Sequence, residues 1–118
     1  ETLEILINKL QDEGFIYIDK DHYDNSLDPT KTQVHIDLHA QGRRSMDAPR
    51  ISPLGPDWER NMVIPVFHTF TFEYMIHMPV PEWGEGKHLY IAFHDGAVVT
   101  ERDVEFPYPP DQGIRILR

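Results

Sequence analysis

Two histidines and a carboxylate alternate within one short segment, His35-Ile36-Asp37-Leu38-His39. Imidazole and carboxylate groups are common ligands of non-haem iron and of zinc. Alternate residues of a β-strand point to the same side, so His35, Asp37 and His39 would share one face. The two histidines would then lie roughly 13 Å apart, too far for both to bind one ion. A metal site here would use Asp37, one of the two histidines and a distant third ligand, for which the candidates are His68, His88 and His94.

The His-x-Asp element at residues 35–37, followed much later by another histidine, is similar to the iron-binding pattern of 2-oxoglutarate-dependent oxygenases. That resemblance implies a metal-dependent enzyme. The chain is short for a complete oxygenase barrel, and it carries no other part of the motif. The competing interpretation is a polar strand face whose histidines are solvated and hold no cofactor, and we favour it.

No segment has the residues of nucleophilic catalysis. The chain has no cysteine and no Gly-x-Ser-x-Gly motif, and Ser26, Ser45 and Ser52 all fall in expected loops. Glycine-rich phosphate-binding loops are also absent. We therefore expect a non-enzymatic protein. The lack of cysteine is compatible with the cytoplasm but does not fix a location.

The net charge of −9 comes from 20 acidic and 11 basic residues. Nucleic-acid-binding domains usually carry the opposite sign, so we expect no nucleic-acid partner. No apolar run approaches the ~18 residues of a membrane helix, so we expect a soluble chain without membrane insertion. An acidic surface does allow one alternative, an inhibitor or immunity-type protein that occupies the basic site of another protein.

Tryptophan, tyrosine and arginine residues in loops bounded by proline and glycine are candidate partner contacts, because these residue types dominate the energetics of protein interfaces. The candidates are Trp58, Trp83, Tyr108, Arg43, Arg44 and Arg60. The alternative is that each aromatic ring folds back over the edge of the chain's own sheet.

Periodicity predicts a helix and then strands. An apolar stripe at helical spacing indicates an N-terminal helix ended by Gly14, and its members are Leu3, Leu6, Ile7 and Leu10. Residues 15–18 predict a short strand. Residues 32–41 alternate without a break, which predicts one buried and one wet face.

The second half of the chain contains a long segment, 42–61, with no convincing periodicity. Residues 62–78 alternate as a strand. Residues 88–94 and 97–106 predict a hairpin joined at Asp95-Gly96, a favoured turn pair. The proline-rich segment 107–118 should be extended, with a last edge strand at 114–117.

We therefore expect a single domain over residues 1–118, of α+β class. One N-terminal helix should pack on a mainly antiparallel β-sheet or partial barrel of about five strands, because the connections lack crossover helices.

Residues 6–42 contain the helix end Asp12-Glu13-Gly14-Phe15, an Asp-rich turn, the strand over 32–38 and Gly42-Arg43. In this order they resemble part of a POTRA repeat of outer-membrane assembly proteins. The segment after Arg44 departs from that pattern.

The sequence favours a protein–protein interaction or structural module, as a small subunit or domain of a larger assembly. Its partner would be another protein or further copies of the same chain. The metal-dependent enzyme and the acidic inhibitor are the alternatives.

Overall fold

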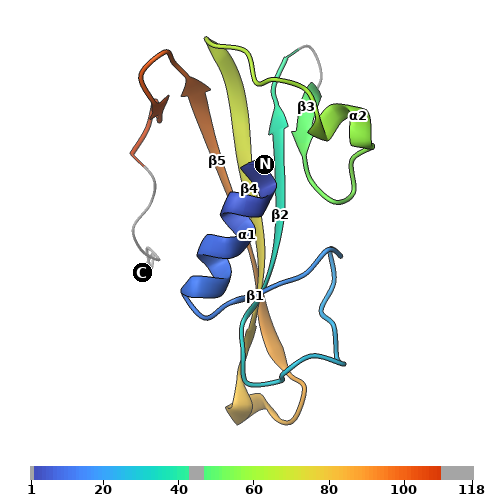
Figure 1. Ribbon diagram of the computed structural model, residues 1–118. Coiled ribbons are helices and arrows are strands. Elements are labelled where there is room, and N and C mark those ends of the chain that lie inside the picture. The colour runs from blue at the N-terminus through green and yellow to red at the C-terminus, as the bar shows by residue number, and fades with distance from the viewer. Residues whose placement is uncertain (1, 43–46, 110–118) are drawn as a thin grey trace.

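The computed structural model describes residues 2–42 and 47–109, in which one N-terminal helix packs on a curled mixed sheet that forms a half-barrel (Figure 1). The predicted α+β class is confirmed. The elements in chain order are α1 (Thr2–Asp12), β1 (Ile16–Tyr17), β2 (Gln33–Ala40), β3 (Asp47–Ile51), α2 (Asp57–Arg60), β4 (His68–Pro79), the 3₁₀ turn η1 (Pro81–Trp83), β5 (His88–Val99) and β6 (Val104–Glu105).

The sheet is built around one central strand and one long hairpin. Its order is β1-β2-β4-β5-β6, and β3 pairs with the other end of β2 on the same side as β1. β1 runs parallel to β2, whereas all other pairs are antiparallel. β4 and β5 pair without a register break from His68↔Val99 to Pro79↔His88.

The expected helix stop at Gly14 is present. Gly14 has φ of +89°, a left-handed conformation that glycine adopts without the steric cost of a Cβ. The amide of Phe15 donates to the Leu10 carbonyl and that of Gly14 to the Gln11 carbonyl, both at 3.0 Å. These two bonds form a Schellman motif, which satisfies carbonyls at the helix end.

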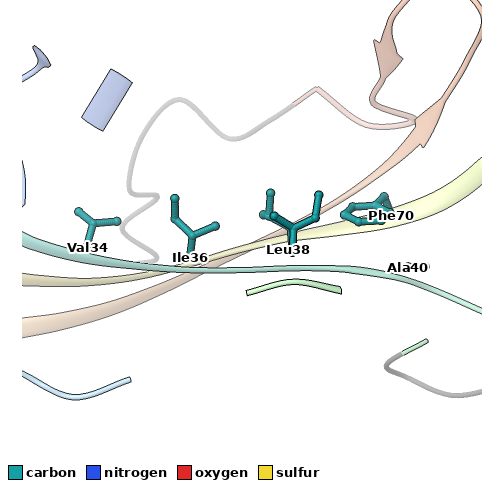
Figure 2. Packing of buried hydrophobic residues seen from close by; sticks show 6 residues of the cluster. Val34, Ile36, Leu38, Ala40 and Phe70 are labelled. Carbon is teal, nitrogen blue, oxygen red and sulfur yellow. The ribbon is translucent and has the colours of Figure 1, made fainter. Parts of the chain in front are cut away.

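The core lies between α1 and one face of the sheet. Val34, Ile36, Leu38 and Ala40 of β2 and Phe70 of β4 rise from the same side of the strands (Figure 2). Each is at most 1% exposed. Burying a large apolar side chain contributes roughly 1.5–3 kcal/mol, so this row accounts for much of the fold's stability. The residues that pack against it include Leu3, Leu6, Leu10, Phe72, Tyr74 and Ile76.

The expectation that the second face of β2 is wet is wrong. Every residue of the strand is buried, including the polar ones. The loop between β1 and β2 covers this face: the Gln33 side-chain amide exchanges two 2.8 Å hydrogen bonds with the backbone of Asp24. The ring Nδ1 of His35 lies 3.2 Å from the Ile18 carbonyl. Strand alternation reports which residues share a face, but a covering loop decides whether that face is solvated.

The predicted hairpin turn at Asp95-Gly96 is also wrong. β5 runs straight through both residues, because Asp95 pairs with Phe72 and Gly96 with Thr71 of the adjacent strand. The chain reverses instead at residues 80–87, where Gly84 has φ of +112° and Gly86 has φ of +70°. A second reversal at residues 100–103 is closed by the Thr100 amide, which donates to the Asp103 carbonyl at 2.9 Å.

The unpatterned segment 42–61 contains regular structure over part of its length, namely β3 and α2. β3 is short, contains Pro49 and pairs with β2 across a register shift between His39 and Ala40. Such an irregular strand leaves no alternation in the sequence. The strand predicted at 114–117 lies outside the described residues.

Candidate functional site

The three predicted metal ligands share one face of β2, opposite the apolar core. His35, Asp37 and His39 are each at most 5% exposed. Both oxygens of Asp37 accept hydrogen bonds from Arg50 of β3, from Nε at 2.8 Å and from Nη2 at 2.6 Å. Such a two-point guanidinium–carboxylate pair is among the stronger ion pairs. The carboxylate of Asp37, which the sequence suggested as a metal ligand, therefore holds β3 against the sheet.

The other expected metal ligands are separated. His68 alternates with Phe70 and so faces the α1 side of the sheet, whereas His88 and His94 belong to the opposite face. His94 Nε2 lies 3.1 Å from Glu73 Oε1, and His39 Nε2 lies 3.6 Å from the same oxygen. Among residues 2–42 and 47–109, no group of three or more His, Asp and Glu side chains is placed to hold a metal ion.

A second cluster forms where β4 and β5 meet the loop that follows β1. The ring of Tyr23 stacks on His88 with centroids 4.2 Å apart, and His77 contacts both His88 and Tyr90 at 5.0 Å. Both ring nitrogens of His77 are buried. Burial, and next the nearby His88, lower the pKa of His77 below its usual range. This cluster fixes the loop to the sheet through ring contacts and disfavours a charged His77.

The predicted partner contacts do not form one patch. Trp58 on α2 and Trp83 on η1 are 61% and 59% exposed, and they lie near opposite ends of the sheet (Figure 1). Tyr108 is exposed beyond β6, and Arg60 pairs with Asp57 on its own helix. Arg43 and Arg44 lie outside the described residues.

Within residues 2–42 and 47–109, the longest stretch of strand with no neighbour on one side belongs to β5. The Val80 amide donates to the Lys87 carbonyl at 3.0 Å, so Val80 and Lys87 form a hydrogen-bonded pair of the antiparallel ladder. Because such pairs alternate along an antiparallel ladder, Tyr90, Ala92 and His94 direct their backbone groups away from β4.

In the described part of the chain, only β6 pairs with this side of β5, and only at Val98 and Val99. We call the remainder, residues 88–97, the β5 edge. Tyr90 and Phe93 on this edge are 51% and 45% exposed.

A pocket of about 500 Å³ lies where the β5 edge meets β6. Phe67 contributes to its wall with φ of +62°, which is unusual for a bulky residue, and is 72% exposed. Its amide donates to the Val99 carbonyl at 2.6 Å. We call this cavity the Phe67 pocket; its lining is Phe67, Val98, Thr100, Glu101, Arg102, Glu105, Phe106 and Pro107.

The sequence interpretation missed both the β5 edge and the Phe67 pocket. The signal for the edge was present, because Leu89, Ile91 and Phe93 alternate up to Asp95-Gly96. Asp95-Gly96 was interpreted as a turn, so the continuation of the strand beyond it was not recognised. The pocket had no local signal, since its walls come from segments more than 30 positions apart.

No protein-family model, curated protein or solved structure matches this chain. In the described residues, no helix has the length and apolarity needed to span a membrane.

Proposed function

We propose that this chain is a non-enzymatic interaction module, a small subunit or domain of a larger assembly, and that it joins its partner by adding a strand to the β5 edge. The observation that carries the proposal is that, within residues 2–42 and 47–109, no strand pairs with the outer side of β5 over residues 88–97. An extended segment of another polypeptide can satisfy such a row of amides and carbonyls, as in β-strand addition.

The composition of the edge supports this role. Natural proteins protect sheet edges with lysine, proline, bulges or very short strands. Residues 88–97 contain neither lysine nor proline, and their pairing with β4 has no register shift. Apart from the charged Asp95, this stretch lacks the usual protection, which is more consistent with a binding surface than with an edge that excludes partners.

Apolar contacts would add to the backbone bonds. Tyr90 faces the histidine-bearing side of the sheet and Phe93 the side that carries α1, so an added strand would meet an aromatic ring on each face.

The enzyme alternative finds less support in the site. The buried carboxylate of Asp37 is engaged at both oxygens, and Glu73 faces His39 and His94. Groups that perform acid–base chemistry must reach a substrate, whereas Asp37 is bonded within the sheet.

The test is site-specific photo-crosslinking in the cells that naturally make the chain. Replacing Tyr90 or Phe93 with a benzophenone amino acid should give one adduct of defined mass at both positions. The control is Phe15, an exposed aromatic residue after α1. Loss of adducts at both β5 positions, or the same adduct from position 15, would exclude the β5 edge as the docking surface. The adduct mass also identifies the kind of partner.

A further inference from the structure

Four of the seven histidines gather where the loop between β1 and β2 crosses the sheet. We call this loop, residues 18–32, the covering loop (Figure 1). His22 belongs to the loop itself, whereas His35, His77 and His88 belong to β2, β4 and β5. The four imidazoles are close enough to interact, because a charge on His22, His35 or His88 opposes a charge on His77.

The covering loop is anchored to the sheet beside His77. Tyr23 stacks on His88 with ring centroids 4.2 Å apart, and its ring lies 5.9 Å from that of His77. The backbone of Asp24 exchanges two hydrogen bonds with the side chain of Gln33. Gln33 is the residue of β2 that pairs directly with His77 of β4. Both anchors therefore rest on or next to rings that can gain a proton.

Negative side chains on this side of the sheet do not compensate a charge on His77. Asp21 Oδ1 lies 3.1 Å from the ring of His22, and both of these side chains are mostly exposed. Glu73 is bonded near His94 and stands four strand positions from His77, roughly 13 Å away. A hydrogen bond with the Asp21 backbone does favour a charged His77, but burial and the neighbouring His88 outweigh it, so the pKa of His77 is lowered.

The covering loop has internal bonds that survive mild acid. The carboxylate of Asp24 accepts hydrogen bonds from the hydroxyl and the amide of Ser26, at 2.6 and 2.9 Å, and these bonds lower its pKa to about 2. Asp28 accepts the equivalent pair from Thr30, which also lowers its pKa. Because both carboxylates stay charged at mildly acidic pH, the loop should move as a folded unit.

We propose that the covering loop is a pH-sensitive cover, which protonation of the histidines beneath it releases below about pH 6.5 while the sheet stays folded. A proton on His77 must share a buried site with His88, whose ring centroid is 5.0 Å away, and release returns both rings to water. The surface uncovered is the polar face of β2 at Gln33 and His35, both 0% exposed when the loop is docked. The switch does not depend on what binds the β5 edge.

The direction follows from the proton balance. The docked state disfavours a proton on His77, whereas the released state lets the ring titrate at its usual pH, so the released state binds protons more readily. The equilibrium should therefore shift toward release as the pH falls, by up to ~10-fold per pH unit for each histidine of this kind.

Amide hydrogen exchange, followed by NMR between about pH 7.5 and 5, tests the switch. The probe is the Asp24 amide, which is bonded to the Gln33 side chain. The reference is the Gln41 amide, which donates to the Thr69 carbonyl at the far end of the β2–β4 pair. After correction for the intrinsic exchange rate, protection at Asp24 should fall at least ~10-fold more than protection at Gln41. A chelator in the buffer prevents adventitious metal from competing with protons for the imidazoles.

Two variants assign the effect to the cluster. His77→Gln removes a titratable ring but leaves Tyr23 stacked on His88, and it should remove most of the fall in protection at Asp24. His94→Gln is the matched control, because His94 lies on the same face of β5 but interacts with Glu73. It should leave the fall unchanged. If His77→Gln already lacks protection at Asp24 at neutral pH, His77→Phe replaces it, since it keeps a ring without a titratable nitrogen.

Three results would overturn the proposal. Constant protection at Asp24 across the pH range would mean that acid does not release the loop. Parallel loss of protection at Asp24 and Gln41 would mean that the sheet opens as a whole. An equally steep fall in the original chain and in the docked position-77 variant would mean that this histidine does not drive the release.

Discussion

Asp37 carries a charge in a strand whose every residue is buried. Its two oxygens are held by Arg50, whose pKa is raised first by this hydrogen bonding. The pair joins β2 to β3 at a point where the backbone register between them shifts. We therefore regard it as the side-chain link that keeps β3 on the sheet.

Removing only one member of this pair should be costly. Arg50→Met leaves the Asp37 carboxylate buried without a partner, and we expect a loss of about 3 kcal/mol in the free energy of unfolding, measured by denaturant titration. The double variant Arg50→Met with Asp37→Leu should recover most of that loss, because no uncompensated charge remains. Equal destabilisation by the single and the double variant would contradict this account.

His77 should make the fold sensitive to mild acid. Burial, followed by the nearby His88, holds its pKa below the usual 6.5. A hydrogen bond with the Asp21 backbone acts in the opposite direction, and His22 and His35 add to the lowering. The unfolded chain therefore binds a proton first. Stability should be unaffected by His77 above about pH 6.5 and should fall as pH decreases through the lowered pKa.

The measurement is the free energy of unfolding between pH 7.5 and about 5. His77→Gln should flatten the decline. Met75→Gln is the matched control, since it places the same amide on the same face of β4 but leaves the imidazole in place. A His77→Gln profile as steep as that of the original chain would assign the sensitivity to another group.

Among the elements, α1 depends on docking for its persistence, because an isolated helix of 11 residues is marginal in water. Leu6 packs against the core, whereas Ile5 is 51% exposed. Leu6→Ala should lower the free energy of unfolding by about 2 kcal/mol, and Ile5→Ala by less than about 0.5 kcal/mol. Thermal or denaturant unfolding measures both, and similar losses would mean that α1 is not docked through Leu6.

The sequence predicted those elements that are defined by residues close to one another in the chain. The stripe containing Leu6 and the glycine at position 14 define α1, and the alternation in residues 32–41 defines β2. The apolar parity of β4, including Phe70 and Phe72, was likewise visible in the sequence.

Contacts between distant parts of the chain determined the features that local sequence patterns could not predict. The polar face of β2 is buried because Asp24 and Arg50 come from loops and strands elsewhere in the chain. Gly96 continues a strand instead of turning, because β4 supplies a full-length partner for β5. The same holds for the candidate surface. The sequence suggested that Trp83 could be exposed, whereas the Phe67 pocket forms only when distant segments come together in the sheet.

At the scale of the whole molecule, the two sides of the sheet differ. In the described residues, β1 and β3 both pair with one side of β2, whereas β6 pairs with the outer side of β5 only at Val98 and Val99. The chain also has a net charge of −9. Any association through the β5 edge must therefore overcome mutual repulsion if the partner is a second copy, and benefits from attraction if the partner is basic.

Ionic strength should separate these two cases. Two copies would carry the same negative charge, so their association would be opposed by mutual repulsion. Raising salt shortens the Debye length from about 30 Å at 0.01 M to about 10 Å at 0.1 M, so an association between two copies should tighten several-fold over this range in sedimentation equilibrium. An acidic inhibitor on a basic target would show the reverse, because screening removes its attraction. Binding that weakens steeply as salt rises would favour the acidic inhibitor and would contradict strand addition formed mainly by backbone pairing at the β5 edge.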